Sequence, residues 1–197
     1  MMLDPTDIVW AFDGRDGRDG GLRAMLGFYL THLRGLLPAA PAAGGDVLDQ
    51  FLADFADDPT NRMLGNPRLA RLFPAALADD HASDEFWRDS IHTQTRARIE
   101  AGEVVLSDLD RYTGFVPVTS AHVDAWAKVL GALRLFWYAE LAGPERLAEP
   151  EEAVIDANPG LAELIDWLGY LLEDLLESRG VCMATGQSLD PDQFQAD

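Results

Sequence analysis

The chain has 197 residues, of which 48% are hydrophobic and 25% charged, and this composition is typical of one folded domain rather than of a disordered chain. Its 34 acidic residues outnumber its 15 basic ones, for a formal net charge of −19. A protein of that charge repels the phosphates of nucleic acids and the surfaces of anionic membranes, so neither is an expected partner.

The first predicted elements are a strand and two helices. Residues 8–12 are β-branched and aromatic, which indicates a strand or one arm of a hairpin, and a glycine-rich turn follows up to residue 20. Apolar residues at helical spacing predict a helix over residues 22–37. After a linker rich in alanine, proline and glycine, a shorter helix is expected at about residues 46–56.

Four further helices are predicted along the rest of the chain. Asn-Pro pairs suit the first positions of a helix, and they open the helices expected at residues 66–73 and 158–179. Between these, helices are expected at residues 83–101, where Gly102 interrupts, and at residues 120–141, where a Gly-Pro pair follows.

These elements together predict a mainly α fold. We expect a single-domain helical bundle of five or six helices with a minor N-terminal strand or hairpin. The domain is expected to span residues 1–180, with the strand and the glycine-rich turn at residues 1–20. Residues 181–197 are expected to form a flexible tail.

The predicted compartment is the cytoplasm. The single cysteine, Cys182, cannot form an internal disulfide, and residues 1–5 lack the basic and apolar regions of a secretory signal. No window of the sequence reaches the roughly 18 apolar residues of a membrane span, because Arg134 and Glu140 interrupt the best candidate.

The last predicted helix separates into an apolar face and an acidic face at about 100° per residue. The residues of the second face include no base, and they are Glu163, Asp166, Tyr170, Glu173, Asp174 and Glu177. A solvated surface explains most stripes of this kind. The alternative is a binding surface for a basic protein partner.

The helix predicted at residues 120–141 is apolar almost all round, which is typical of the central helix of a bundle. Arg134 falls within one apolar face. A buried arginine needs a carboxylate or carbonyl groups around it, because its charge cannot be lost. We therefore expect a buried ion pair between Arg134 and Asp166, with Glu140 or Asp124 as other possible partners. The alternative is an anion-binding pocket around Arg134.

The sequence predicts no catalytic residue, no cofactor and no metal site. It contains no His-Glu-x-x-His pattern, no phosphate-binding glycine loop, no Gly-x-Ser-x-Gly motif and no pair of cysteines. These absences favour a protein that is not an enzyme.

Three segments carry a family resemblance. The first is Asn-Pro-Arg-Leu-Ala-Arg-Leu-Phe-Pro at residues 66–74, with Glu-Phe-Trp-Arg at residues 85–88; the second combines Trp126 with Arg134 and the leucine after it. The third is Ile-Asp-Trp-Leu-Gly-Tyr-Leu at residues 165–171. In this order they resemble an actinobacterial family, domain of unknown function 2017, over about residues 66–179. The resemblance implies no reaction, but the family's genes often lie near that of a Clp-protease adaptor, which suggests a link to protein quality control.

Three functions are open at this point. The leading one is a non-enzymatic adaptor or regulator that offers an acidic surface to a basic protein. The second is a small-molecule-binding or enzymatic helical domain with a pocket around Arg134. The third is an inhibitor or immunity-type protein whose carboxylates mimic nucleic acid. A deep pocket at Arg134 would favour ligand binding, whereas a filled core with an exposed acidic face would favour an adaptor. The sequence leaves the oligomeric state open.

Overall fold

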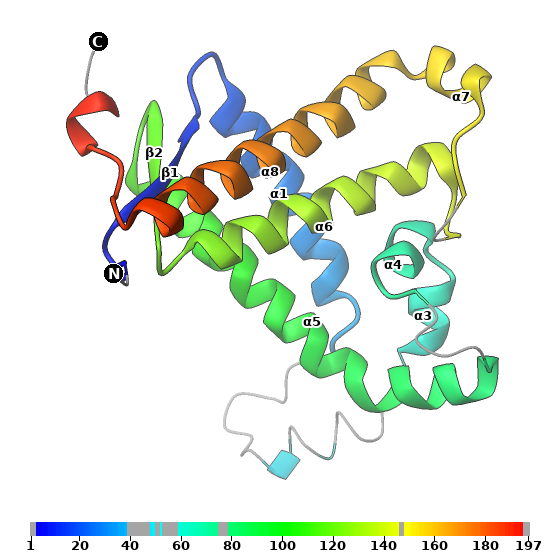
Figure 1. Cartoon of the computed structure of the whole chain (residues 1–197). Helices are drawn as coiled ribbons and strands as arrows, with labels where there is room; N and C mark the ends of the chain where they lie inside the picture. Colours follow the sequence, from blue (N-terminus) through cyan, green and yellow to red (C-terminus); the bar gives the residue numbers. More distant parts are fainter. Residues whose placement is uncertain are drawn as a thin grey trace.

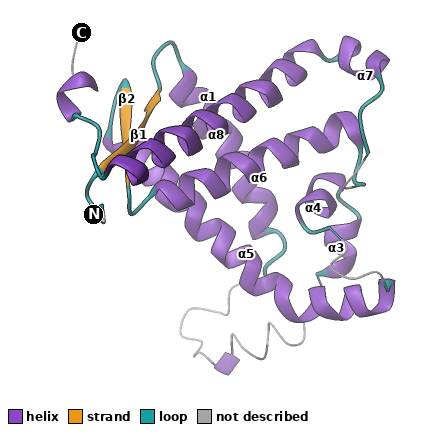
Figure 2. Ribbon diagram, viewed as in Figure 1, coloured by secondary structure: helices purple, strands orange, loops and turns teal. Residues whose placement is uncertain are grey.

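The computed structural model describes residues 3–38, 48–49, 52, 59–74, 79–145 and 148–194, and its fold is mainly α with a small two-stranded sheet, as predicted (Figure 2). The elements with assigned bounds are, in chain order, β1 (Ile8–Asp13), α1 (Arg18–Arg34), α3 (Thr60–Leu64), α4 (Pro67–Leu72), α5 (Asp80–Arg111), β2 (Phe115–Thr119), α6 (Val123–Ala142), α7 (Glu152–Ala157), α8 (Pro159–Thr185) and the short 3₁₀ helix η1 (Pro191–Phe194). The helix expected at residues 46–56 lies outside the described residues except at 48–49 and 52, which are helical.

The predicted N-terminal strand is present, and its partner comes from far along the chain. β1 pairs antiparallel with β2, in a register that runs from Ile8 opposite Thr119 to Asp13 opposite Phe115. Pro117 is compatible with β2 because a two-stranded sheet consists only of edge strands. The sheet therefore joins the start of the chain to the connection between α5 and α6.

Helix α6 occupies the centre of the fold, as its apolar sequence predicts. It contacts α8, α5, α4 and α1, and it runs beside α8 through the middle of the molecule (Figure 1). Trp126, Leu130, Leu133 and Phe136 on α6 are fully buried. None of the described helices is both long and apolar enough to cross a membrane.

Helix α5 is continuous through Gly102, so the predicted interruption there was wrong. A Cβ atom at this position would lie 2.7 Å from Cδ2 of Leu30 on α1. Gly102 is therefore a point of close approach between α1 and α5, and its missing side chain allows the contact without ending the helix.

Helix α8 also continues past its predicted end near Gly180. It reaches Thr185 and is terminated by Gly186, whose φ of 68° is the left-handed conformation that glycine adopts most easily. Beyond the helix, the backbone N–H of Leu189 donates a hydrogen bond of 2.8 Å to the carbonyl of Ile8. The division into a domain of residues 1–180 and a flexible tail stays a prediction.

Gly102 of α5 and Gly180 of α8 should respond oppositely to replacement by alanine. At Gly180, where no atom lies within 4 Å of the new Cβ, alanine should raise the free energy of unfolding by about 0.5–1 kcal/mol through its better helix propensity. At Gly102 the clash with buried Leu30 should outweigh that gain and lower the free energy of unfolding by about 1–2 kcal/mol. Urea denaturation of both variants measures the difference, and equal stabilisation would show that α1 and α5 are not closely packed at Gly102.

Candidate functional site: the acidic face of helix α8

Helix α8 is fixed to the fold by its apolar side. Ile165, Leu168 and Leu175 are buried, and the helix contacts α6 along its length and β1 near its end. Ser178 adds a hydrogen bond of 2.7 Å from its hydroxyl to the carbonyl of Val9. The helix is thus held on one side, and the opposite side faces solvent.

The solvent side carries all six residues of the predicted partner-binding stripe, and each of them is exposed. We call this set the α8 acidic face: Glu163, Asp166, Tyr170, Glu173, Asp174 and Glu177. Tyr170, at the middle of this face, is 66% exposed. Val181, one turn beyond Glu177, is 58% exposed on the same side of the helix. Val181 was not predicted as part of this surface, because the helix was expected to end near Gly180.

Asp174 differs from the other acids of the face because it also has a structural contact. One of its carboxylate oxygens accepts a hydrogen bond of 2.7 Å from the indole N–H of Trp10 on β1. Trp10 itself is buried and packs against Trp126 of α6. Asp174 therefore helps to attach α8 to the sheet.

The remaining acids of the face have no cationic partner in the part of the chain that the structure describes. The nearest arginine along the helix, Arg179, instead pairs with Asp124 of α6 at 2.7 Å. The negative charge of the α8 acidic face is thus left for solvent ions or for a partner to neutralise.

The predicted buried ion pair between Arg134 and Asp166 is wrong. Both side chains are exposed, and no ion pair joins them. The Arg134 side chain lies across Gly169 of α8, where a Cβ atom would be 3.2 Å from its Nε. Glycine leaves room at this position, so the guanidinium end of Arg134 lies against α8 while the side chain remains exposed to solvent.

The two other possible partners of Arg134 are paired elsewhere. Glu140 contacts Arg68 of α4 at 2.6 Å, and Asp124 contacts Arg179. Arg134 therefore has an exposed position between two helices and does not line a deep, closed pocket of the kind that would favour ligand binding there.

A comparison with protein-family models matches residues 7–178 to the domain of unknown function 2017. The chain belongs to that family. The matched segment of this DUF2017 protein runs from β1 through most of α8, and it includes the whole α8 acidic face. Comparisons with curated proteins and with solved structures find no match.

The first segment of the family resemblance has a structural role in this DUF2017 protein. The Asn66 side chain caps α4 by accepting a hydrogen bond of 3.1 Å from the backbone N–H of the residue two positions on. Arg71 is buried and donates hydrogen bonds of 3.0, 2.6 and 3.2 Å to the carbonyls of Gly143, Glu145 and Ala148. The segment thus fixes α4 against the chain that follows α6.

A buried polar cluster that no sequence pattern predicted joins α5 to the start of α6. The Asp108 carboxylate, 3% exposed, accepts a hydrogen bond of 2.9 Å from the indole N–H of Trp126. It also lies 3.0 Å from Nδ1 of His122. The cluster satisfies a carboxylate that would otherwise be costly to bury, and we assign it a structural role.

The described side chains show no metal-binding group. Nowhere among them do three or more histidine, cysteine, aspartate or glutamate side chains gather closely enough to hold an ion. On α8, the described residues form a charged, solvent-exposed helix face.

Proposed function

We propose that this DUF2017 protein is a cytoplasmic, non-enzymatic adaptor or regulator that binds a basic protein through the α8 acidic face. The observation that carries the proposal is the exposure of the complete face, with five carboxylates on one side of one helix. A role in protein quality control fits the neighbourhood of the family's genes and belongs to the same proposal.

The energetics of the face support a binding role. Like charges three and four residues apart on a helix cost a few tenths of a kcal/mol each, and bases at neighbouring positions would offset that cost. The α8 acidic face contains no base. A surface of one sign attracts an oppositely charged protein over a distance and accelerates association. Tyr170 and Val181 add exposed apolar surface along the same line, and an exposed tyrosine is a frequent centre of binding energy at interfaces.

The position of Arg134 favours this function over ligand binding around that residue. An exposed guanidinium lying across Gly169 is not the wall of an enclosed site. An inhibitor that mimics nucleic acid would be a special case of the same proposal, in which the basic partner is itself a DNA- or RNA-binding protein.

The test is a pull-down, from the cells that make this protein, with two variants of equal charge. The α8-face variant carries the substitutions E163Q, D166N, E173Q and E177Q, and it keeps Asp174 because that residue contacts Trp10. The control variant neutralises four exposed acids elsewhere in the chain, with the substitutions E100Q, E103Q, E149Q and D192N. Each variant removes four charges, so the net charge of both changes from −19 to −15.

Quantitative mass spectrometry of the bound proteins distinguishes the outcomes. We expect a basic protein that the native chain and the control variant retain equally, and that the α8-face variant loses at least about tenfold. Equal retention by all three chains would show that the face is only a solvated surface.

A further inference from the structure

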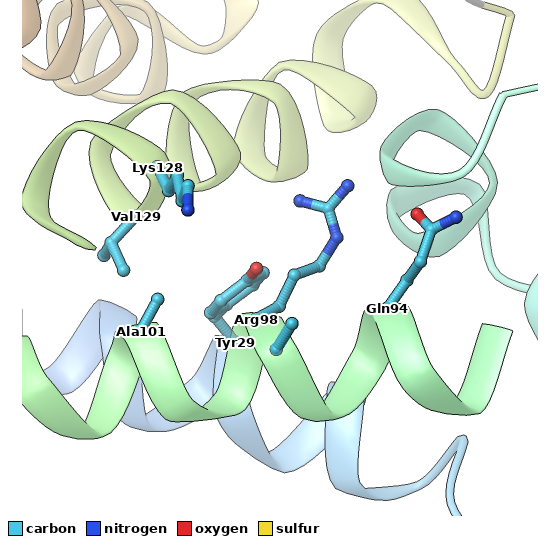
Figure 3. Close-up of a pocket in the computed structure, with 7 residues that line it drawn as sticks. Tyr29, Gln94, Arg98, Ala101, Lys128 and Val129 are labelled. Carbon is cyan, nitrogen blue, oxygen red and sulfur yellow. The ribbon is translucent and has the colours of Figure 1, made fainter. Parts of the chain in front are cut away.

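A cavity of about 300 Å³ lies between helices α1, α5 and α6, away from the α8 acidic face (Figure 3). The described residues that line it are Tyr29, Gln94, Ala97, Arg98, Ala101, Lys128 and Val129. The volume is at the lower end of the range of small-molecule sites. Alanine and valine side chains form one part of the wall, and the tips of Tyr29, Arg98 and Lys128 project into the space between α5 and α6.

The charge of this cavity is opposite to that of the protein as a whole. Among the described lining residues, Arg98 and Lys128 are cations and none is a carboxylate. Acids outnumber bases 34 to 15 over the whole chain, and Lys128 is its single lysine. A cavity whose charged residues, among those described, are both cations is therefore an exception in this acidic protein, and it would attract an anion.

Arg98 is held in place by the protein. Its Nη2 donates a hydrogen bond of 3.2 Å to the carbonyl of Leu72, and its guanidinium lies 5.0 Å from the centre of the Phe73 ring. An arginine has five N–H donors, so this contact leaves donors for a ligand. Lys128 is exposed and has no ion pair with any described carboxylate.

Tyr29 supplies a neutral donor beside these cations. Its side chain is 1% exposed. Burial raises the pKa of the Tyr29 phenol above its ordinary value of 10.0, although the positive charge of Arg98 opposes the rise. The hydroxyl is therefore protonated at neutral pH and can donate a hydrogen bond to an anionic oxygen.

We propose that the cavity binds a small organic anion, a carboxylate or a phosphate on an apolar body. Lys128 and Arg98 contact the anionic group, with the Tyr29 hydroxyl and the Gln94 amide as neutral partners. Ala97, Ala101 and Val129 contact the apolar body. This site is independent of the proposed function, since it shares no residue with the α8 acidic face.

The test follows backbone amide signals of the full-length, ¹⁵N-labelled protein by NMR during titration with three probes. Benzoate and phenyl phosphate carry the two candidate anionic groups, and benzyl alcohol is a neutral control of similar size. The K128Q variant removes the exposed cation of the cavity. The R111Q variant removes an exposed cation at the far end of α5 and is its matched control.

We expect saturable shifts at Gln94, Ala97, Ala101 and Val129 with at least one anion, and none with benzyl alcohol. The anion that binds more tightly identifies the ligand class. K128Q should weaken binding about tenfold, since it removes one charge-assisted contact. R111Q should keep the native affinity within about twofold, and K128R should restore most of what K128Q loses. The proposal is overturned if neither anion gives saturable shifts up to about 10 mM, if benzyl alcohol binds equally well, or if K128Q and R111Q bind alike.

Discussion

Replacing Asp108 with alanine is expected to lower the free energy of unfolding by about 3–4 kcal/mol. The carboxylate is 3% exposed and accepts hydrogen bonds from Trp126 and from His122. Its removal leaves the buried indole N–H without an acceptor, and an unsatisfied buried donor costs about 1–3 kcal/mol. The loss of the charge-assisted bonds and the space left by the side chain add to that cost.

Two further variants make this result specific to the cluster. Glu103→Ala removes an exposed carboxylate on the same helix, which pairs with Arg34 at 3.3 Å, and should cost less than about 1 kcal/mol. Trp126→Phe removes the indole donor and keeps an aromatic ring, so its cost should be smaller when Asp108 is already absent. Urea denaturation measures all of these variants. If Asp108→Ala and Glu103→Ala were equally stable, the cluster would not hold α5 to α6.

The sequence predicted best the features that depend on neighbours along the chain. The two Asn-Pro pairs marked the starts of α4 and α8, as observed, because capping is decided within one helical turn. The apolar period of α8 separated buried from exposed residues correctly, with Leu168 at 0% and Tyr170 at 66% exposure. The sequence of α6 is apolar on nearly all sides, and this pattern correctly predicted that the helix lies at the centre of the fold.

Features that depend on distant segments were missed or mistaken. A glycine in a helix has two meanings, an end or a close contact, and Gly102 proved to be a contact with Leu30, 72 positions earlier in the chain. The pairing of β1 with β2 joins segments about 100 residues apart, which no local pattern reveals. Arg134 was expected inside because its neighbours are apolar, yet Gly169 on another helix gives it a place at the surface.

The two candidate sites also differ in whether they depend on neighbouring or on distant residues of the chain. The α8 acidic face belongs to one helix and was predicted from spacing alone. The cavity with Arg98 and Lys128 is formed by residues of three helices. Its existence depends on how these helices pack together, which cannot be deduced from a local sequence pattern. Only the scarcity of lysine, with Lys128 as the single one, could have drawn attention to that position.

Neutralising the α8 acidic face should lower the association rate constant for the basic partner that the pull-down identifies. The expected decrease is roughly ten- to hundredfold at low ionic strength. Electrostatic attraction between opposite surfaces raises association rates by about 10- to 1000-fold, and the variant removes four of the five carboxylates on the face. Dissociation should change much less, because charges at the rim of an interface act mainly on the association rate. Raising the salt concentration should reduce the difference between native protein and variant, since ions screen exposed charges.

The most direct measurement is therefore the association rate constant of the purified partner with the native protein, the α8-face variant and the equally charged control variant, at about 50 and 300 mM salt. The account predicts that the native protein and the control variant associate rapidly at low salt and slow steeply as salt rises. It predicts that the α8-face variant is slow at both concentrations, with a much weaker salt dependence. Equal rates and equal salt dependence for the two variants would show that net charge, and not the α8 acidic face, attracts the partner, and would contradict the proposed function.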